Sequence, residues 1–199
     1  MKVQLEKTFP MPASAQVTWD LLRDIERVAG CMPGARITER IDDQHYRGTV
    51  AVKFGPASMS FRGDVEVRDL DPLSRTLRLL GKGADSTGSS GASMDLTARV
   101  EAVDSASCNL VGASEVSISG KAATFGARMM SAVADQVLNQ FAANFAVQVQ
   151  ALQAQQQPAA GSPAAEPAPA PASAELNGLA LLWAVVSGWL RNLFRAKKA

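Results

Sequence analysis

The chain lacks most of the residue patterns that catalysis, metal binding and secretion require. Its 199 residues include one histidine, one tyrosine and two cysteines. Cys31 and Cys108 are far apart and form no CxxC pair, so neither a zinc site nor a disulfide framework is expected. The first residues contain no continuous apolar run, which argues against a secretory signal and predicts a cytosolic protein. We therefore expect no bound metal and no covalently bound cofactor.

The first 154 residues also lack an excess of charge of either sign. Four of the 20 Lys and Arg residues lie within residues 176–199, and two of the 19 Asp and Glu residues lie within residues 155–175. This leaves 16 basic residues against 17 acidic ones in residues 1–154. Nucleic-acid-binding proteins carry clustered Lys and Arg. We therefore expect no nucleic-acid partner.

Known catalytic motifs are missing as well. No GxSxG elbow is present, and the glycines of "GKGADSTGSSG" and "GKAATFG" have the wrong spacing for a phosphate-binding loop. His45 stands alone beside a predicted turn, which is more typical of a surface residue than of a general base. Asp85 and Asp95 are the best available carboxylate pair, on strands expected to be neighbours, although solvating a hairpin is their more ordinary role. The scarcity of catalytic groups favours a binding protein over an enzyme.

The order of patterned segments predicts an α+β fold. Residues 2–9 alternate as a strand, and residues 14–30 follow as one or two short helices with Ser14 as a cap. Six period-2 segments separated by turn residues then fill residues 35–119, and residues 121–154 have the pattern of one long helix. The economical packing is a curved antiparallel sheet of about seven strands wrapped around that helix. We assign residues 1–154 to this domain.

The long helix is predicted to be two-faced. Its apolar face carries Met130, Val133, Val137, Phe141, Phe145 and Leu152. Its other face is rich in uncharged amides, namely Gln136, Asn139, Gln140, Gln150 and Gln153. Two interpretations stay open for the amide face: it is exposed to solvent, or it docks on a partner or near a membrane.

A sheet that grips a helix leaves a space between them, which predicts a ligand cavity with mostly apolar walls. The alternative is that the same side chains fill an ordinary core. The candidate cavity residues are Trp19, Met32, Phe54, Met59, Phe61, Met94, Phe125, Met129, Val133, Val137 and Phe141.

Residues 155–175 contain five prolines and almost no bulky apolar residue, which predicts a disordered linker. In polyproline form the linker reaches roughly 65 Å.

Residues 176–199 are predicted to form a membrane-anchoring helix. The charge-free run 178–190 amounts to about 20 Å of helix, shorter than the ~30 Å hydrocarbon core of a bilayer. At 100° per residue the large apolar side chains gather on one half, which favours an amphipathic helix lying in the plane of the membrane. Basic residues at its end would meet anionic headgroups on the cytoplasmic face of the inner membrane. A spanning helix and a helix packed on protein stay as alternatives. The predicted anchor residues are Leu179, Leu182, Trp183, Val186, Trp189, Leu190, Arg191, Leu193, Phe194, Arg195, Lys197 and Lys198.

Four segments carry a resemblance to a known family: "VTWDLLRDIERVAGCMPGA" (17–35), "YRGTVAVKFGPASMSFRGDVEV" (46–67), "LGKGADSTGSSGAS" (80–93) and "VSISGKAATFGARMM" (116–130). Together they resemble the G-subunit family of carbon monoxide dehydrogenase, a branch of the START-like, polyketide-cyclase-like helix-grip superfamily. The resemblance covers residues 1–150. The family motif positions are Asp24, Glu26, Cys31, Pro33 and Gly34, followed by Gly120, Lys121, Phe125 and Gly126. Pro33 and Gly34 are expected to turn the chain at the mouth of the cavity.

The resemblance implies a helix-grip fold and a molybdenum-containing hydroxylase of the carbon monoxide dehydrogenase type as partner. It also implies recruitment of that enzyme to the cytoplasmic membrane and transport of a respiratory quinone. Three hypotheses follow: a carrier of a lipophilic ligand, a recruitment adaptor that carries no ligand, and an enzyme acting on a hydrophobic substrate. The first is favoured.

Overall fold

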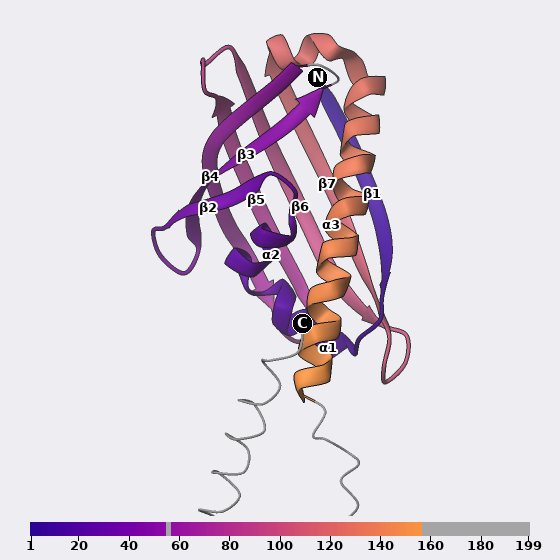
Figure 1. The fold of residues 1–199 in the computed structure, drawn as a ribbon. Helices are drawn as coiled ribbons and strands as arrows, with labels where there is room; N and C mark the ends of the chain where they lie inside the picture. The colour runs from indigo at the N-terminus through magenta and orange to yellow at the C-terminus, as the bar shows by residue number, and fades with distance from the viewer. Residues whose placement is uncertain (55–56, 157–199) are drawn as a thin grey trace, which may run out of the picture. The chain divides into compact units, whose positions relative to one another are not determined.

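The structure is a computed structural model that describes residues 1–54 and 57–156, with only the backbone of Phe54 and Ala57. A single curved sheet holds a long helix against its concave face, and two short helices lie at one end (Figure 1). The elements are β1 (Lys2–Met11), α1 (Ala15–Leu22), α2 (Ile25–Cys31), β2 (Ala35–Arg40), β3 (His45–Phe54), β4 (Ala57–Asp71), β5 (Thr76–Asp85), β6 (Ser90–Ala102), β7 (Cys108–Gly120), the 3₁₀ helix η1 (Lys121–Phe125) and α3 (Gly126–Gln156).

The sheet has seven strands in the order β1-β7-β6-β5-β4-β3-β2, and every neighbouring pair is antiparallel. Strands β2 to β7 follow one another as a meander, and β1 joins at the β7 edge. This topology confirms the predicted α+β architecture and the predicted strand number.

The two short helices form where the sequence predicts them. The Ser14 side chain accepts a hydrogen bond from the Val17 backbone N–H at 3.3 Å and caps α1. The Asp24 carboxylate caps α2 in the same way through Arg27 N–H at 3.1 Å. On α1, Trp19 and Leu21 are almost fully buried. These helices therefore close one end of the sheet with a dense core.

The long helix begins later than the sequence pattern predicts. Residues 121–125 form η1, and α3 starts at Gly126, whose φ of 80° falls in the left-handed region. The expected apolar face is present, since Met130, Phe141 and Phe145 are buried. A predicted helix over 121–154 is thus wrong in its first turn, because the left-handed backbone at Gly126 interrupts the α-helical hydrogen bonding.

Two amides of α3 have structural roles. Gln153 accepts a hydrogen bond from the Ser14 backbone N–H at 3.0 Å, and Asn144 donates one to the Cys31 carbonyl at 2.9 Å. They attach the C-terminal half of α3 to the start of α1 and the end of α2. On the amide face, Gln153 therefore contacts another part of the same domain.

The concave face of the sheet contains a line of glycines. Gly63 of β4 lies opposite both Gly48 of β3 and Gly83 of β5. A Cβ atom on Gly63 would overlap the carbonyl oxygen of Lys82, and a Cβ on Gly83 would lie 2.8 Å from the carbonyl oxygen of Arg62. The backbones of β3, β4 and β5 approach each other too closely on this face for side chains, as expected where a sheet bends sharply.

The buried apolar residues form two separate clusters. The larger core joins α1, α2 and the C-terminal half of α3 to the sheet, and includes Trp19, Leu77, Phe145 and Val149. Among the described residues, the smaller cluster has Phe61, Ala122 and Met130 as buried members and lies under η1 and the start of α3. One end of the domain is therefore densely packed and the other is lightly packed.

Replacing Gly63 by alanine is expected to destabilise the domain by about 1–3 kcal/mol, since the new methyl group would overlap the Lys82 carbonyl. Gly81→Ala is the matched control: its Cβ would meet only the Met94 side chain, at 3.6 Å. That change should be neutral or stabilising by up to about 1 kcal/mol. Urea unfolding of both variants measures the difference, and equal stabilities would refute a steric role for Gly63.

Candidate functional site

The centre of the interior is lined by apolar side chains that are only half buried. Directly opposed residues of antiparallel strands share a face, and Val3, Val116, Met94 and Gly81 form such a row on the concave face. Met94, Val116 and Gly81 belong to neither buried cluster. Val137 lies on the α3 stripe that faces the sheet and is also half buried. Partly exposed apolar side chains on the concave face and on the facing stripe of α3 indicate accessible space between sheet and helix.

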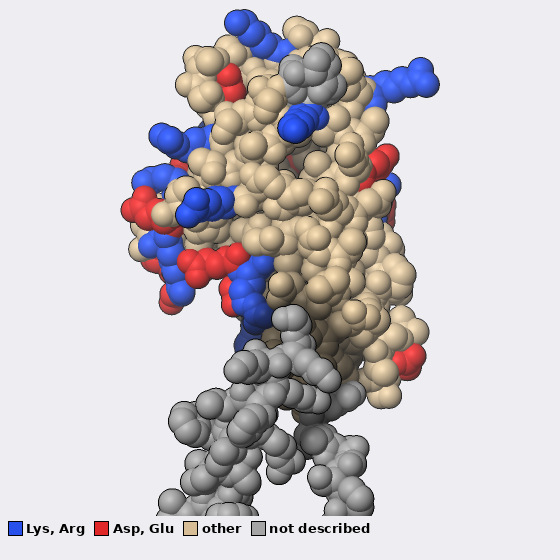
Figure 2. All heavy atoms as spheres, viewed as in Figure 1, with Lys and Arg blue, Asp and Glu red and all other residues tan. Residues whose placement is uncertain are grey.

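The glycine line borders this space. Gly48, Gly63 and Gly83 follow one another along the row next to Met94, with Ala92 as the next residue of that row on β6. Over these positions the sheet presents backbone in place of side chains. Figure 2 shows a small hollow in the surface on this side of the molecule, between the β3–β4 side and α3. The space therefore lies between the two clusters and has apolar walls.

The lightly packed end is closed by η1, which docks on the β5–β6 turn. The Lys121 N–H donates to the Ser89 carbonyl at 3.1 Å, and the Ala122 N–H donates to the Ser90 hydroxyl at 2.9 Å. Gly120 adopts a φ of 68°, and a Cβ there would overlap the Ser89 carbonyl oxygen. The two glycine-rich sequence segments around residues 85 and 120 thus form one structural unit.

Asp85 organises that unit. Its carboxylate accepts hydrogen bonds from the Thr87 hydroxyl at 2.6 Å, the Ser89 hydroxyl at 3.1 Å and the Ser90 backbone N–H at 2.7 Å. These hydrogen bonds, the one from Thr87 above all, lower the pKa of Asp85 from 3.8 to about 2. Because the carboxylate is charged and already fully hydrogen-bonded, Asp85 fixes the turn that receives η1.

The predicted cavity residues are distributed over three environments. Trp19 and Phe141 belong to the dense core, with Met32 packed against it. Met59, Phe61, Phe125 and Val133 belong to the small cluster at the η1 end. Met94 and Val137 lie between the clusters, and Met129 is 41% exposed. The side chain of Phe54 lies outside the described residues. Contact of these residues with a ligand stays a prediction.

The family motif positions have clear structural roles. Asp24 is the cap of α2, and Glu26 lies in the first turn of that helix, where a negative charge suits the helix dipole. Cys31 is buried, and burial raises the pKa of its thiol. Gly34 has a φ of 77° and reverses the chain between α2 and β2, as its expected place in a turn requires. Pro33 belongs to the same turn.

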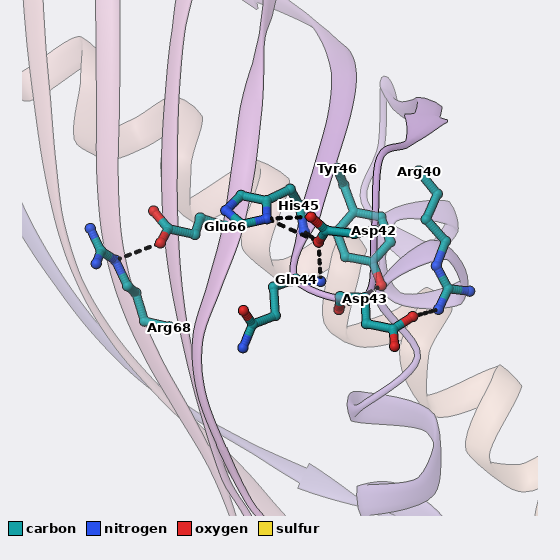
Figure 3. A network of polar contacts seen from close by, with 8 residues as sticks. All are labelled: Arg40, Asp42, Asp43, Gln44, His45, Tyr46, Glu66 and Arg68. Atoms are coloured by element: carbon teal, nitrogen blue, oxygen red, sulfur yellow. Dashed lines mark hydrogen bonds and ion pairs between the residues drawn. The ribbon is translucent and has the colours of Figure 1, made fainter.

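His45 lies outside the interior, at the β2–β3 turn (Figure 3). Its Nδ1 atom is 2.9 Å from each carboxylate oxygen of Asp42. The pKa of Asp42 is lowered chiefly by the Gln44 backbone N–H and then by the His45 side chain. The imidazole therefore supports an exposed turn, in line with its expected role as a surface residue.

Asp85 and Asp95 form no carboxylate pair. Strands β5 and β6 are neighbours as predicted, but Asp95 lies opposite Leu80, five residues before Asp85. Because side chains alternate along a strand, the two carboxylates are on opposite faces of the sheet. Asp95 lies 3.8 Å from Arg78. The pairing hypothesis is wrong because the strand register keeps the two groups apart.

A second pocket, on the outer surface, has a different character. It measures about 430 Å³ and lies between the α1–α2 segment and strands β2 to β4. Charged side chains dominate its lining, which consists of Asp20, Arg23, Asp24, Ile25, Glu26, Arg40, Tyr46 and Leu70. Such a lining is unsuited to an apolar ligand.

Two further findings concern the described residues alone. They contain no group of three or more His, Cys, Asp or Glu side chains placed to hold a metal ion. No helix among them has both the length and the hydropathy needed to cross a bilayer. The predicted linker 155–175 lies outside the described residues from position 157 onward, as does the whole predicted anchor, including Trp183, Trp189 and Arg191.

A family model described as the G subunit of carbon monoxide dehydrogenase (CoxG) matches residues 8–150. No curated protein matches the chain. A conserved protein from Geobacillus kaustophilus has a similar structure, with a TM-score of 0.68 and 17% identity over 75% of this chain and 96% of its own. The Zhui aromatase/cyclase from Streptomyces sp. R1128 gives a TM-score of 0.57 and 16% identity, covering 75% of this chain and 94% of its own.

A START superfamily protein from Mycobacterium smegmatis gives a TM-score of 0.54 and 18% identity, covering 75% of this chain and 98% of its own. At these identities the likeness shows the fold alone, which is the helix-grip fold of the START and cyclase proteins.

Replacing Asp85 by asparagine should lower the stability of the domain at neutral pH, because the charged acceptor of the turn is lost. The pKa is depressed in the folded state, so the contribution is complete above pH 3.8 and is lost as the pH falls from 3.8 to about 2. Urea unfolding across this range should show the wild-type advantage disappearing. Asp95→Asn is the control, with little effect expected from an exposed group. A constant difference at every pH would contradict this role of Asp85.

Proposed function

The chain belongs to the G-subunit family of carbon monoxide dehydrogenase (CoxG), and on that premise we propose that it carries a lipophilic ligand, a respiratory quinone, between the cytoplasmic membrane and a partner enzyme. The partner is a molybdenum-containing hydroxylase of the carbon monoxide dehydrogenase type. In this proposal residues 176–199 hold the domain at the cytoplasmic face of the membrane.

The observation that carries the proposal is the half-buried apolar surface between the two clusters. Met94 and Val116 lie on the concave face of the sheet, Val137 lies on the stripe of α3 that faces the sheet, and each of the three is only partly buried. Exposed apolar surface inside a domain favours an apolar occupant, since burial of such surface is worth about 25 cal/mol per Å². The flexible side chain of Met94 adapts to a ring or an isoprenoid chain.

We also propose that the domain acts without chemistry of its own. Among the described residues, the Asp85 carboxylate is saturated with hydrogen bonds and the His45 imidazole pairs with Asp42 on the outside. The Cys31 and Cys108 thiols are buried, and burial raises the pKa of each, which disfavours the reactive thiolate. A carrier needs no proton-transfer group, and these groups are committed to structural contacts.

Filling the interior should remove ligand binding while leaving the fold intact. Val137→Trp places an indole in the space between α3 and the sheet that the ligand would occupy, and should lower quinone affinity by roughly tenfold or more, which is about 1.4 kcal/mol of binding free energy. Ala143→Trp, on the exposed face of the same helix, is the matched control and should bind normally. Quinone extracted from purified protein and measured by mass spectrometry, with circular dichroism as a check on folding, gives the result. Wild-type protein that is empty and takes up no quinone would support an adaptor instead.

Deleting residues 176–199 should strongly reduce membrane association and leave quinone binding by the domain unchanged. The predicted anchor contributes four basic residues, each worth about 1 kcal/mol near an anionic surface. Flotation of the full chain and of the deletion variant with vesicles measures association, and uptake of added quinone measures binding. Equal flotation of both forms would contradict the predicted anchor.

A further inference from the structure

Five exposed cations near one end of the domain have no ion-pair partner among the described residues. Each lacks a carboxylate within 4.0 Å: Lys53, Arg62, Lys82, Lys121 and Arg128. By contrast, most other cations of the domain, such as Lys2, Lys7 and Arg47, contact an acidic side chain. A cation without such a contact remains available to an external anion.

The fold gathers these five residues at one end of the sheet. Lys53 is the residue before the end of β3. Arg62 of β4 lies opposite Ala84, which is the residue before the end of β5. Lys82 lies three residues before the end of β5. Lys121 begins η1, and Arg128 lies in the first turn of α3. Two parts of this end of the domain therefore carry positive charge: the ends of β3 to β5, with Arg62 and Lys82 on the convex face of the sheet, and the η1–α3 junction.

The carboxylates near this end are already bound. Asp64 contacts Arg47 at 3.2 Å, Glu115 contacts Lys2 at 2.7 Å, and Asp85 is enclosed in its turn. The N-terminus of α3, which has the positive end of the helix dipole, adds to the potential there. In Figure 2, blue side chains predominate at the η1 end, while red ones gather among the blue on the α1–α2 side. The charge of this nearly neutral domain is thus unevenly distributed.

The basic end is also the lightly packed one. Among the described residues, three buried apolar side chains close it, together with the buried Asp85 and Ser90, against a larger apolar core at the α1–α2 end. A lipophilic ligand enters and leaves most easily where few contacts must break. Met129, beside Arg128, is 41% exposed and offers an apolar contact next to the cations. Basic groups around an apolar tip fit a bilayer with anionic headgroups.

We propose that this end of the domain, formed by the ends of β3 to β5, η1 and the start of α3, docks on an anionic phospholipid bilayer. The lightly packed end, where a ligand would enter and leave, then faces the membrane. The docking itself is argued from charge and packing. The purpose of the orientation, delivery of a lipophilic ligand, rests on the function proposed above. A tail anchor alone would leave the orientation of the domain free.

Site-specific fluorescence on the full-length chain tests the orientation. Cys31 is 3% and Cys108 1% exposed, so a cysteine introduced at Met129 is labelled selectively with an environment-sensitive dye. Val103→Cys, in the β6–β7 turn at the opposite end, gives the matched probe and is 61% exposed in the native side chain. With phosphatidylglycerol-containing vesicles, the dye at position 129 should shift to the blue and the dye at position 103 should not. Pure phosphatidylcholine vesicles should leave both unchanged.

Charge reversal tests the cations. Each basic residue is worth about fivefold in surface affinity, so Lys121→Glu with Arg128→Glu should lower the ratio of docked to undocked domain by roughly 25-fold or more. Arg27→Glu with Arg75→Glu reverses two cations away from this end, in α2 and in the β4–β5 turn, that likewise have no carboxylate partner in the described part of the chain, and should leave the signal at position 129 intact.

Three results would overturn the proposal: an equal response at both probe positions, a response independent of lipid charge, and a shift at position 129 caused by the partner enzyme but not by vesicles. The last would assign the basic end to an acidic protein surface. Quinone extraction is measured separately. Docking without quinone uptake refutes the proposed function alone, and uptake without oriented docking refutes this inference alone.

Discussion

The architecture depends on how closely the backbones of β3, β4 and β5 approach one another on the concave face. Gly48, Gly63 and Gly83 lie side by side there, and a Cβ atom at any of them would press on a neighbouring carbonyl. Without side chains the strands can bend tightly, and the sheet curls around α3. The same absence leaves this part of the inner surface bare. One local constraint therefore produces both the grip on the helix and the space beneath it.

The helix α3 lies over two regions that differ in packing. Its C-terminal half is fixed by Phe145 and Val149 in the dense core, and Gln153 and Asn144 attach it to the short helices. Its N-terminal half packs with the smaller cluster of described apolar residues and with η1, which is held by the turn that Asp85 organises. Opening the domain at the η1 end costs fewer contacts, so local fluctuations are expected there first.

Much of the fold follows from the sequence pattern, because alternation and helical periodicity are local. The seven strands, the Ser14 cap and the apolar stripe of α3 are all confirmed. What local patterns cannot supply is register. Three features depend on which residues of different strands are paired. They are the alignment of Gly48, Gly63 and Gly83, the separation of Asp85 from Asp95, and the contact of Ser90 with Ala122. Gly126 was visible in the sequence, but its left-handed φ was not.

The chemistry of the interior bears on how a ligand is released. Hydrophobic burial is non-directional and proportional to area, so an apolar ligand between Met94, Val116 and Val137 would be held without any polar bond that must break first. Its release then requires another apolar environment within reach, because water offers none. A domain of this kind needs its opening placed against the donor or the acceptor. The charge on the surface of the domain and its attachment to the membrane would determine this placement. Because both features lie outside the interior, they can change without altering the ligand site.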